Sequence, residues 1–219
     1  YCRLIEPTTQ QGKEEMFLAG ENRYTAQQSN FSKIPGSPVA YWVSGSFIQA
    51  FVNGVSLNSI APTRKGMFTG DNDKWLKFWH EIDYRDLFFK QKPYNKGVIN
   101  WNNNGQSVIN FKGSGNINTT LYFRPCITWS LVTTYKPSFR GIFDNDHVMG
   151  DAGPIAAAKE NDILYLLGLL NTKFVAEVAA LIAPTINFSN GVAGDIPVLF
   201  DNLNRPKIEA LAQENVKIS

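Results

Sequence analysis

Apolar residues occur in short runs along the chain, separated by polar, glycine-rich or proline-rich stretches. After Ser44 they recur at helical spacing, which predicts a helix over residues 45–53 that Ser44 caps and Gly54 ends. Another short helix is expected near residues 13–19, and a short strand or buried segment at residues 39–43.

The middle of the chain has a different pattern of residues. Asp71 or Asn72 is placed to cap a short helix that carries the apolar residues Trp75, Leu76, Phe78 and Trp79. Beyond it, β-branched and aromatic runs alternate with Asn-Gly and Gly-Ser-Gly-Asn turns. These runs predict strands at residues 98–101, 108–111, 120–123, 127–132 and 139–143.

The C-terminal third predicts the longest helix. It runs over residues 163–182, is capped by the Asn-Asp pair at 161–162, and stops before Pro184. An extended segment at 196–199 and an amphipathic helix at 206–214 follow. The expected fold class is therefore α+β, a strand-rich mixed domain closed by C-terminal helices.

Composition narrows the class of protein. The 219 residues are 43% hydrophobic and 18% charged, which is typical of a globular chain rather than a disordered one. Cys2 and Cys126 are too few for a disulfide framework or a thiolate zinc site, and they fit a cytoplasmic, reducing location. The longest apolar run, residues 163–170, is too short to span a bilayer, so we expect no membrane partner. Because the chain starts without Met, we expect a piece of a longer protein.

Charge is unevenly distributed. Residues 1–61 hold 4 basic and 4 acidic side chains, residues 62–140 hold 12 and 5, and residues 141–219 hold 5 and 10. A basic middle beside an acidic end indicates a polyanion as partner for the middle.

The sequence matches known catalytic motifs only weakly. His80 and His147 are the only histidines, and no Gly-x-Ser-x-Gly elbow accompanies them. Asp144, Asp146 and His147, with Asp151, are possible metal ligands, although Asp-rich loops are usually turns and caps. The glycine-rich segment 113–116 lacks a Gly-Lys-Ser/Thr ending and is interpreted as a hairpin turn.

Residues whose side chains can bind nucleic acid are concentrated in three predicted loops. Arg and Lys can reach guanine N7 and O6, Asn pairs with adenine N6 and N7, and hydroxyls and ammonium groups hold phosphates. Trp101 and Trp129 are each expected to be core residues rather than base-stacking platforms. The loops comprise Thr63, Arg64, Lys65, Thr69, Asp71, Asn72 and Lys74; Lys96, Asn100, Trp101, Asn102, Asn103 and Asn104; and Arg124, Thr128, Trp129, Ser130 and Arg140.

These residues carry a family resemblance. Residues 61–74 (Ala-Pro-Thr-Arg-Lys-Gly-Met-Phe-Thr-Gly-Asp-Asn-Asp-Lys), followed by Trp79-His80-Glu81, resemble the recognition region of large adenine-specific DNA methyltransferases. The sequence is most similar to the PglX type of BREX phage-defence systems and to related type IIG restriction–modification enzymes. Matching segments continue in the same order at residues 93–97, 98–101, 123–130, 141–144, 166–173, 184–188 and 194–198.

The resemblance implies a DNA target-recognition domain over residues 33–219, with residues 1–32 as a lead-in that links to a missing catalytic domain. It implies a parent enzyme that transfers methyl from S-adenosylmethionine to adenine N6, whereas this chain alone holds no cofactor and methylates nothing. Implied partners are double-stranded DNA, the catalytic domain of the same parent chain and other defence-system subunits. The candidate DNA contacts are Arg64, Lys65, Thr69, Asn72, Lys74, Lys96, Asn100, Asn102, Arg124, Thr128, Ser130 and Arg140.

Two alternatives remain open. The acidic end suits a protein-interaction module that docks other defence-complex subunits or an inhibitor. An autonomous metal-dependent hydrolase would instead use His147 and its neighbouring aspartates.

Overall fold

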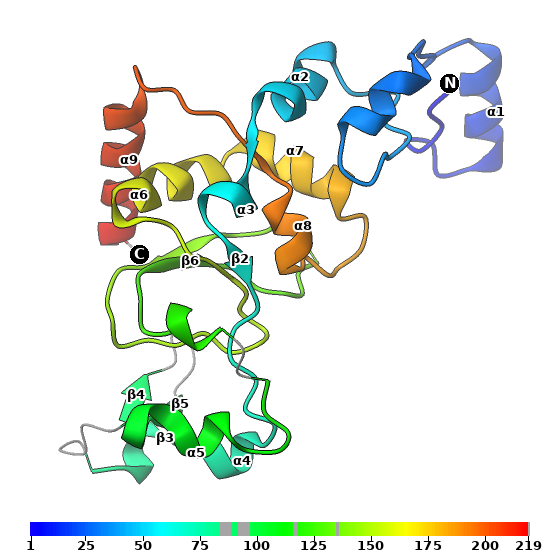
Figure 1. Cartoon of the computed structure of the whole chain (residues 1–219). Helices are drawn as coiled ribbons and strands as arrows, with labels where there is room; N and C mark the ends of the chain where they lie inside the picture. Colours follow the sequence, from blue (N-terminus) through cyan, green and yellow to red (C-terminus); the bar gives the residue numbers. More distant parts are fainter. Residues whose placement is uncertain (84–88, 92–96, 116–117, 135, 219) are drawn as a thin grey trace. The chain divides into compact units, whose positions relative to one another are not determined.

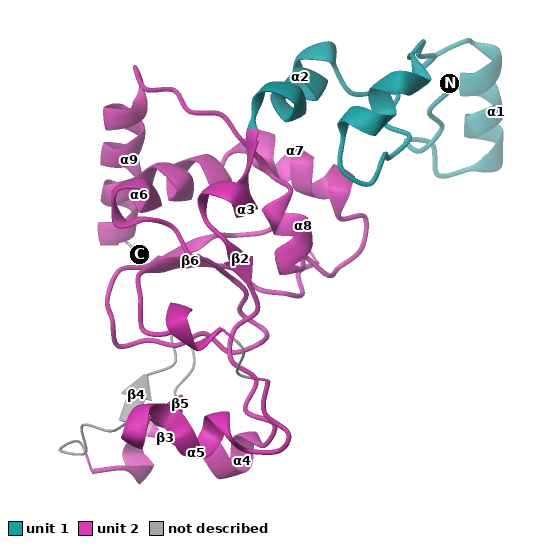
Figure 2. Cartoon of the chain, viewed as in Figure 1, with its two compact units in different colours: residues 1–54 teal, residues 55–219 magenta. Residues whose placement is uncertain are grey.

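The chain forms two compact units, shown in separate colours in Figure 2. Unit 1 comprises Tyr1–Gly54 and unit 2 comprises Val55–Ser219. This computed structural model describes residues 1–83, 89–91, 97–115, 118–134 and 136–218. The sequence placed a division after residue 32, and the roles assigned to the segments on either side of it stay predictions.

Unit 1 is built from helices. They are α1 (Gln10–Leu18), the 3-10 helix η1 (Gln28–Lys33) and α2 (Gly45–Asn53). The Ser44 hydroxyl accepts a hydrogen bond from the Phe47 N–H at 3.2 Å, and α2 ends at Gly54. The predicted cap and end of this helix are therefore confirmed.

Residues 39–43, predicted to be a short strand or a buried segment, form no strand, and Ala40 is the one buried residue among these five. Ala40 is buried, but the aromatic side chains beside it pack within unit 1 instead of joining a sheet. Tyr41 stacks on Tyr1 at 4.7 Å between ring centroids, and Trp42 meets the Tyr41 ring edge-on. Local ring packing thus outweighs the β propensity of the segment.

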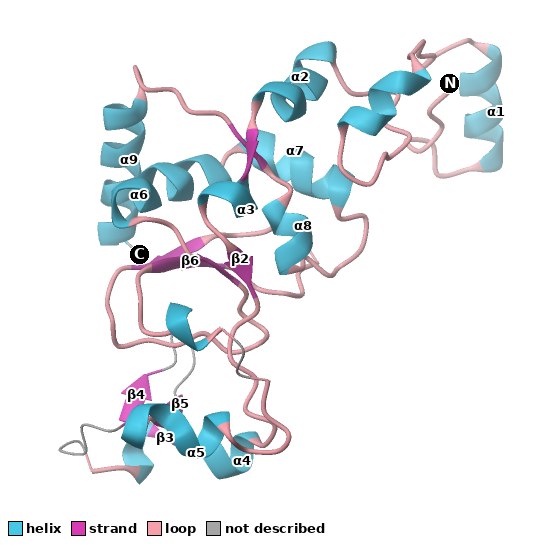
Figure 3. Ribbon diagram, viewed as in Figure 1, coloured by secondary structure: helices cyan, strands magenta, loops and turns pink. Residues whose placement is uncertain are grey.

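Unit 2 mixes short strands with helices, as Figures 1 and 3 show. The α+β class is confirmed. Its helical elements are α3 (Leu57–Ile60), α4 (Asn72–Trp75), η2 (Trp79–Glu81), η3 (Asn102–Gly105), α5 (Gln106–Ile109), η4 (Thr119–Leu121), α6 (Glu160–Leu170), α7 (Lys173–Ile182), α8 (Asn190–Gly194) and α9 (Arg205–Ile218). Its strands are β1 (Val55–Ser56), β2 (Thr63–Arg64), β3 (Leu76–Phe78), β4 (Phe89–Gln91), β5 (Gly97–Asn100), β6 (Cys126–Thr128), β7 (Arg140–Ile142), β8 (Ile155–Ala156) and β9 (Pro197–Val198).

An antiparallel sheet of order β2-β8-β6-β7 occupies the centre of unit 2. One of its faces meets α6, because a Cβ added at Gly141 would lie 3.2 Å from the Leu167 side chain. The other face carries the apolar cluster of Cys126, Ile142, Met149 and Ile155. Helix α9 packs on α6 in turn, so the predicted closure by C-terminal helices is confirmed.

A second sheet, of order β3-β5-β4, forms a lobe with α4 and α5, at the bottom of Figure 1. Its apolar cluster joins Ile99 of β5 and Val108 of α5 to Met67, Tyr122 and Val148. Trp75 and Trp101 pack against this cluster. We call this part of unit 2, with its two helices, the distal lobe.

Two predicted strands are helical. Residues 108–111 fall in and after α5, and residues 120–123 fall in and after η4. Val108 is completely buried, so one face of a single helical turn satisfies the apolar pattern that β propensity had suggested. The short helix capped by Asp71 is confirmed, but it ends at Trp75, and Leu76 begins β3. The predicted strand at 139–143 is confirmed as β7.

The predicted helix over residues 163–182 is two helices, α6 and α7, bent by 78° at the break between them. The Asn171 amide donates to the Phe139 carbonyl at 3.0 Å, and its oxygen accepts from the Phe139 N–H at 3.1 Å. Thr172 then caps α7 by accepting from the Val175 N–H at 3.3 Å. Within the described residues no single helix has the length and hydropathy to cross a bilayer, and α6 with α7 meets that criterion only as this bent pair.

Alkaline pH is expected to destabilise unit 2. Burial, with the nearby negative charge of Asp144, raises the pKa of the Cys126 thiol from 9.0 to about 12. The unfolded chain releases this proton near its ordinary pKa, so the thiol's contribution to the free energy of unfolding is constant below pH 9 and falls as pH rises from 9 to 12. Burial of Tyr122, whose pKa rises from 10.0 to about 12, adds to the loss. Urea midpoints between pH 7 and 11 measure the effect, and a Cys126→Ala variant that declines as steeply as wild type would contradict the thiol's part.

Candidate nucleic-acid interface

The segment from Arg64 to Lys74, here called the strap, connects the central sheet to the distal lobe. Its backbone is held from both sides. The Met67 N–H donates to the Met149 carbonyl at 2.7 Å, and the Asp151 N–H donates to the Met67 carbonyl at 2.9 Å. The Gly115 N–H donates to the Phe68 carbonyl at 2.8 Å. The strap is therefore a fixed element, unlike a free loop.

Two glycines allow this close approach. A Cβ at Gly66 would lie 2.0 Å from the Gly150 carbonyl oxygen. Gly70 has a φ of +74°, and a Cβ there would lie 2.4 Å from the Gly113 carbonyl carbon. Side chains at these positions would push the strap away from its supports.

The strap presents several candidate contacts to solvent. Lys65, Asn72 and Lys74 are exposed. The Lys74 ammonium lies 4.9 Å from the Trp75 ring centroid and 4.6 Å from that of Phe111, so cation–π contacts hold it against the distal lobe. The positive charges of Lys65 and Lys74 are thus exposed on a backbone that hydrogen bonds hold in place.

Arg64 is more constrained than the sequence suggested. It is half-buried, and its Nη1 donates to the Asn58 side-chain oxygen at 3.2 Å and to the Thr63 carbonyl at 2.8 Å. The same Asn58 oxygen accepts from the Thr63 N–H at 3.0 Å. The Arg64 guanidinium therefore has a structural role, because its hydrogen bonds link β2 to α3.

Two candidate threonines do not belong to an exposed interface. Thr69 is 4% exposed, and its hydroxyl donates to the Asn72 side-chain oxygen at 2.7 Å. Thr128 is 2% exposed, and its hydroxyl donates to the Pro154 carbonyl at 2.9 Å. Their predicted assignment as DNA contacts is corrected, because both hydroxyls are buried and donate to acceptors within the protein.

The second predicted loop follows β5. Asn100 and Asn102 are exposed, and the Asn102 N–H donates to the Asn100 side-chain oxygen at 2.9 Å. Lys96 lies outside the described residues. Trp101 is half-buried against Tyr122 and Phe123, which agrees with its predicted packing role.

Strand pairing in the central sheet places residues of the third predicted loop and of the strap on the same face. Arg64 pairs with Ile155, Ile155 with Thr128, and Thr128 with Arg140. Directly paired residues project to the same face, so Arg64 and Arg140 share a face with their Cα atoms roughly 14 Å apart across three strand spacings. The Arg140 Nη2 donates to the exposed Ser130 hydroxyl at 3.0 Å, and Arg124 is exposed nearby in sequence.

Further cations lie on the distal lobe. Lys77 of β3 is exposed, as is Lys112, next to the Phe111 ring that contacts Lys74. Neither lysine belongs to the three predicted loops. Only the excess of basic over acidic residues in 62–140 indicated cations in this part of the chain. The positive charge of this region therefore extends beyond the predicted loops.

The Asp144–His147 region has little catalytic character. The His147 Nδ1 donates to the Asp144 carboxylate at 2.5 Å. Partial burial acts to raise the pKa of Asp144, but bonds from His147 and from the Asp146 N–H outweigh it and lower that pKa. In the described part of the chain, no three His, Cys, Asp or Glu side chains gather to hold a metal ion. This arrangement is that of a capped turn.

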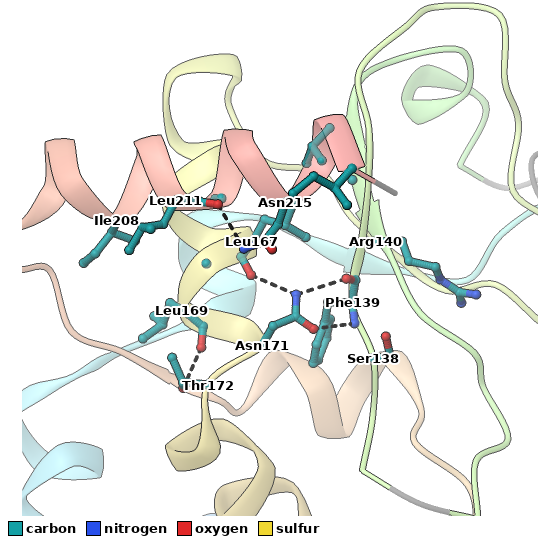
Figure 4. A pocket seen from close by; sticks show the side chains of 15 residues that line it. Ser138, Phe139, Arg140, Leu167, Leu169, Asn171, Thr172, Ile208, Leu211 and Asn215 are labelled. Atoms are coloured by element: carbon teal, nitrogen blue, oxygen red, sulfur yellow. Dashed lines mark hydrogen bonds between the residues drawn. The ribbon is translucent and has the colours of Figure 1, made fainter.

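A groove of about 910 Å³ lies between α6, α9 and β7 and is drawn in Figure 4. The described residues of its walls are mainly apolar and include no aspartate, glutamate, histidine or cysteine. Figure 4 shows the Arg140 side chain directed away from Asn171 and the groove. The lining residues are Ser138, Phe139, Arg140, Gly141, Leu167, Gly168, Leu169, Asn171, Thr172, Ile208, Leu211, Ala212, Asn215, Val216 and Ile218.

No family model matches the chain. Over 90% of its length the chain is 29% identical to the adenine-specific methyltransferase PglX of Lacticaseibacillus casei (strain Zhang). Over 100% of its length it is 29% identical to the adenine-specific methyltransferase BrxX of Escherichia coli O9:H4 (strain HS). The chain spans only 20% and 19% of the lengths of these relatives. The predicted resemblance to PglX-type methyltransferases is confirmed, and it concerns about a fifth of the length of each relative.

Proposed function

We propose that unit 2 is a DNA target-recognition domain, which reads the sequence around an adenine that a catalytic domain of the same parent protein methylates at N6. The rigid strap, with Lys65, Asn72 and Lys74 outward, is the observation that carries the proposal. A side chain that reads a base must be held to within a fraction of an ångström, and a support bonded on both edges provides this. The similarity to adenine-specific methyltransferases supports the same assignment.

The parent's chemistry defines what this unit would do. A methyltransferase acting on a base within duplex DNA extrudes that base into its catalytic pocket. A separate surface must then grip the flanking duplex through phosphates and read neighbouring base edges. In the proposal Lys65, Lys74, Lys77, Lys112 and Arg124 supply the phosphate contacts, and Asn72, Asn100 and Asn102 read bases.

We assign S-adenosylmethionine to the catalytic domain of the parent. The groove between α6, α9 and β7 is large enough for a ligand, but its described lining residues include no aspartate or glutamate to bond ribose hydroxyls or balance a sulfonium charge. The described residues of this groove therefore do not fit the cofactor, and in the proposal unit 2 contributes recognition while the parent's catalytic domain transfers the methyl group.

Charge removal on the strap tests the proposal. Lys65→Ala and Lys74→Ala are each expected to weaken binding of all duplex sequences alike and to flatten the plot of log affinity against log salt by about one unit. Fluorescence anisotropy with a labelled duplex at several salt concentrations measures both quantities. Lys207→Ala, an exposed lysine on α9, is the matched control and should leave the slope unchanged. Equal slopes for wild type and both strap variants would refute the assignment.

The apolar groove favours a second candidate function, docking of a protein partner. Leu211 and Ile218 of α9 line it and are 52% and 78% exposed. A surface of this kind is typical of a protein contact. Binding that ignores added DNA but saturates with another subunit of the defence system would favour this candidate.

A further inference from the structure

A left-handed turn joins β5 to α5 in the distal lobe. Asn103, Asn104 and Gly105 have φ values of +50°, +55° and +72° in succession. Left-handed residues normally occur singly, and a residue other than glycine is strained in this conformation. Two asparagines therefore stand where glycine would be the less strained choice.

The turn is clamped to the core of the lobe. The Gly105 N–H donates to the Trp101 carbonyl at 3.3 Å, and a Cβ at Gly105 would lie 2.7 Å from the Trp101 ring. That ring packs edge-on against Phe123 with centroids 4.8 Å apart. The Asn102 N–H is bonded to the Asn100 side chain at 2.9 Å. The two asparagines are consequently held in a defined orientation.

The side chains of the two asparagines are not engaged by the described part of the chain. Asn103 and Asn104 are both exposed. Among the described residues, no hydrogen bond engages either side chain, in contrast to Asn22, the left-handed asparagine of unit 1, which bonds to Glu6 at 3.2 Å. The folded chain therefore does not use these amides to hold itself together.

The turn lies beside the cationic part of the distal lobe. Helix α5, a single turn over Gln106–Ile109, separates it from Phe111, whose ring contacts the Lys74 ammonium. A helix rises 1.5 Å per residue, so this separation is roughly 8 Å along the chain. A duplex whose phosphates meet Lys74 and Lys112 would bring base edges within reach of the asparagines.

The geometry points to Asn103 and Asn104 as adenine-reading residues, an inference that rests on the proposed function and deepens it. An asparagine amide presents one donor and one acceptor, which match N7 and the N6 amino group of adenine in the major groove. The preferred ligand is thus a duplex with an adenine at one or two fixed positions beside the methylated base.

Glycine substitution separates reading from folding. Asn103→Gly with Asn104→Gly keeps the left-handed backbone without strain and removes both amides. The double variant is expected to keep or raise its melting temperature and to keep its salt slope, because it loses no charge. Its preference for adenine at the one or two positions assigned to Asn103 and Asn104, measured by selection from a randomised duplex pool, should disappear. Asn22→Gly makes the same change in unit 1 and should retain the preference.

A base analogue completes the test. Replacing the selected adenine by 7-deazaadenine removes the N7 acceptor and should weaken wild-type binding about 5- to 150-fold, while the double variant should not respond. If wild type and double variant show the same base preference, this inference fails and the proposed function stands. If the wild-type chain neither binds nor discriminates duplexes, the proposed function fails and this inference fails with it.

Discussion

Replacing Gly66 by alanine is expected to destabilise unit 2 strongly. The added Cβ would lie 2.0 Å from the Gly150 carbonyl oxygen and 2.5 Å from the Met149 carbonyl oxygen. Both atoms belong to backbone that bonds the strap through Met67, so neither can move without breaking those bonds. We expect a loss of roughly 3 kcal/mol in the free energy of unfolding, at the upper end of overpacking effects.

Thermal unfolding measures this loss. For a chain of this size a loss of roughly 3 kcal/mol corresponds to a fall of about 6–12 °C in melting temperature. Gly191→Ala is the matched control, since the Cβ there meets only the Ser189 hydroxyl at 3.8 Å within α8. The control should be neutral or slightly stabilising. A Gly66→Ala protein that melts with the control would show that the strap is not fixed against residues 149–151.

The same strap shows what sequence alone can predict. The sequence predicts Asp71 or Asn72 as a helix cap, and Asp71 is the cap, because capping depends on one side chain and the N–H three residues later. The strap's exposure pattern was not predicted. Met67 and Thr69 are 2% and 4% exposed, whereas Phe68 between them is 49% exposed. That alternation is a property of the packed strap, and the residue types do not specify it.

Long-range pairing explains the other differences. Arg64 and Arg140 share one face only because β2, β8, β6 and β7 adopt a particular register. A shift of one residue would send either side chain to the opposite face. The break at Asn171 likewise depends on Phe139, which lies far from it in sequence. Helical periodicity in residues 163–182 contained no sign of this contact.

Trp129→Ala is expected to be the most damaging substitution in the third predicted loop. The indole is completely buried, with ring centroids 5.5 Å from Phe139 and 6.4 Å from Phe188. Its Nε1 donates to the Phe188 carbonyl at 2.9 Å, which fastens the end of β6 to the segment before α8. Loss of the ring should cost about 3–5 kcal/mol in the free energy of unfolding.

Trp129→Phe distinguishes packing from hydrogen bonding. It keeps most of the ring volume but leaves the Phe188 carbonyl without its donor, so about 1–3 kcal/mol should be lost. Urea unfolding followed by circular dichroism should rank wild type above Trp129→Phe and Trp129→Phe above Trp129→Ala. Because Ser130 follows Trp129 and accepts from Arg140, both variants should also disturb that pair and weaken duplex binding under conditions where they remain folded. A Trp129→Phe protein as unstable as Trp129→Ala would place most of the energy in the hydrogen bond and contradict the packing account.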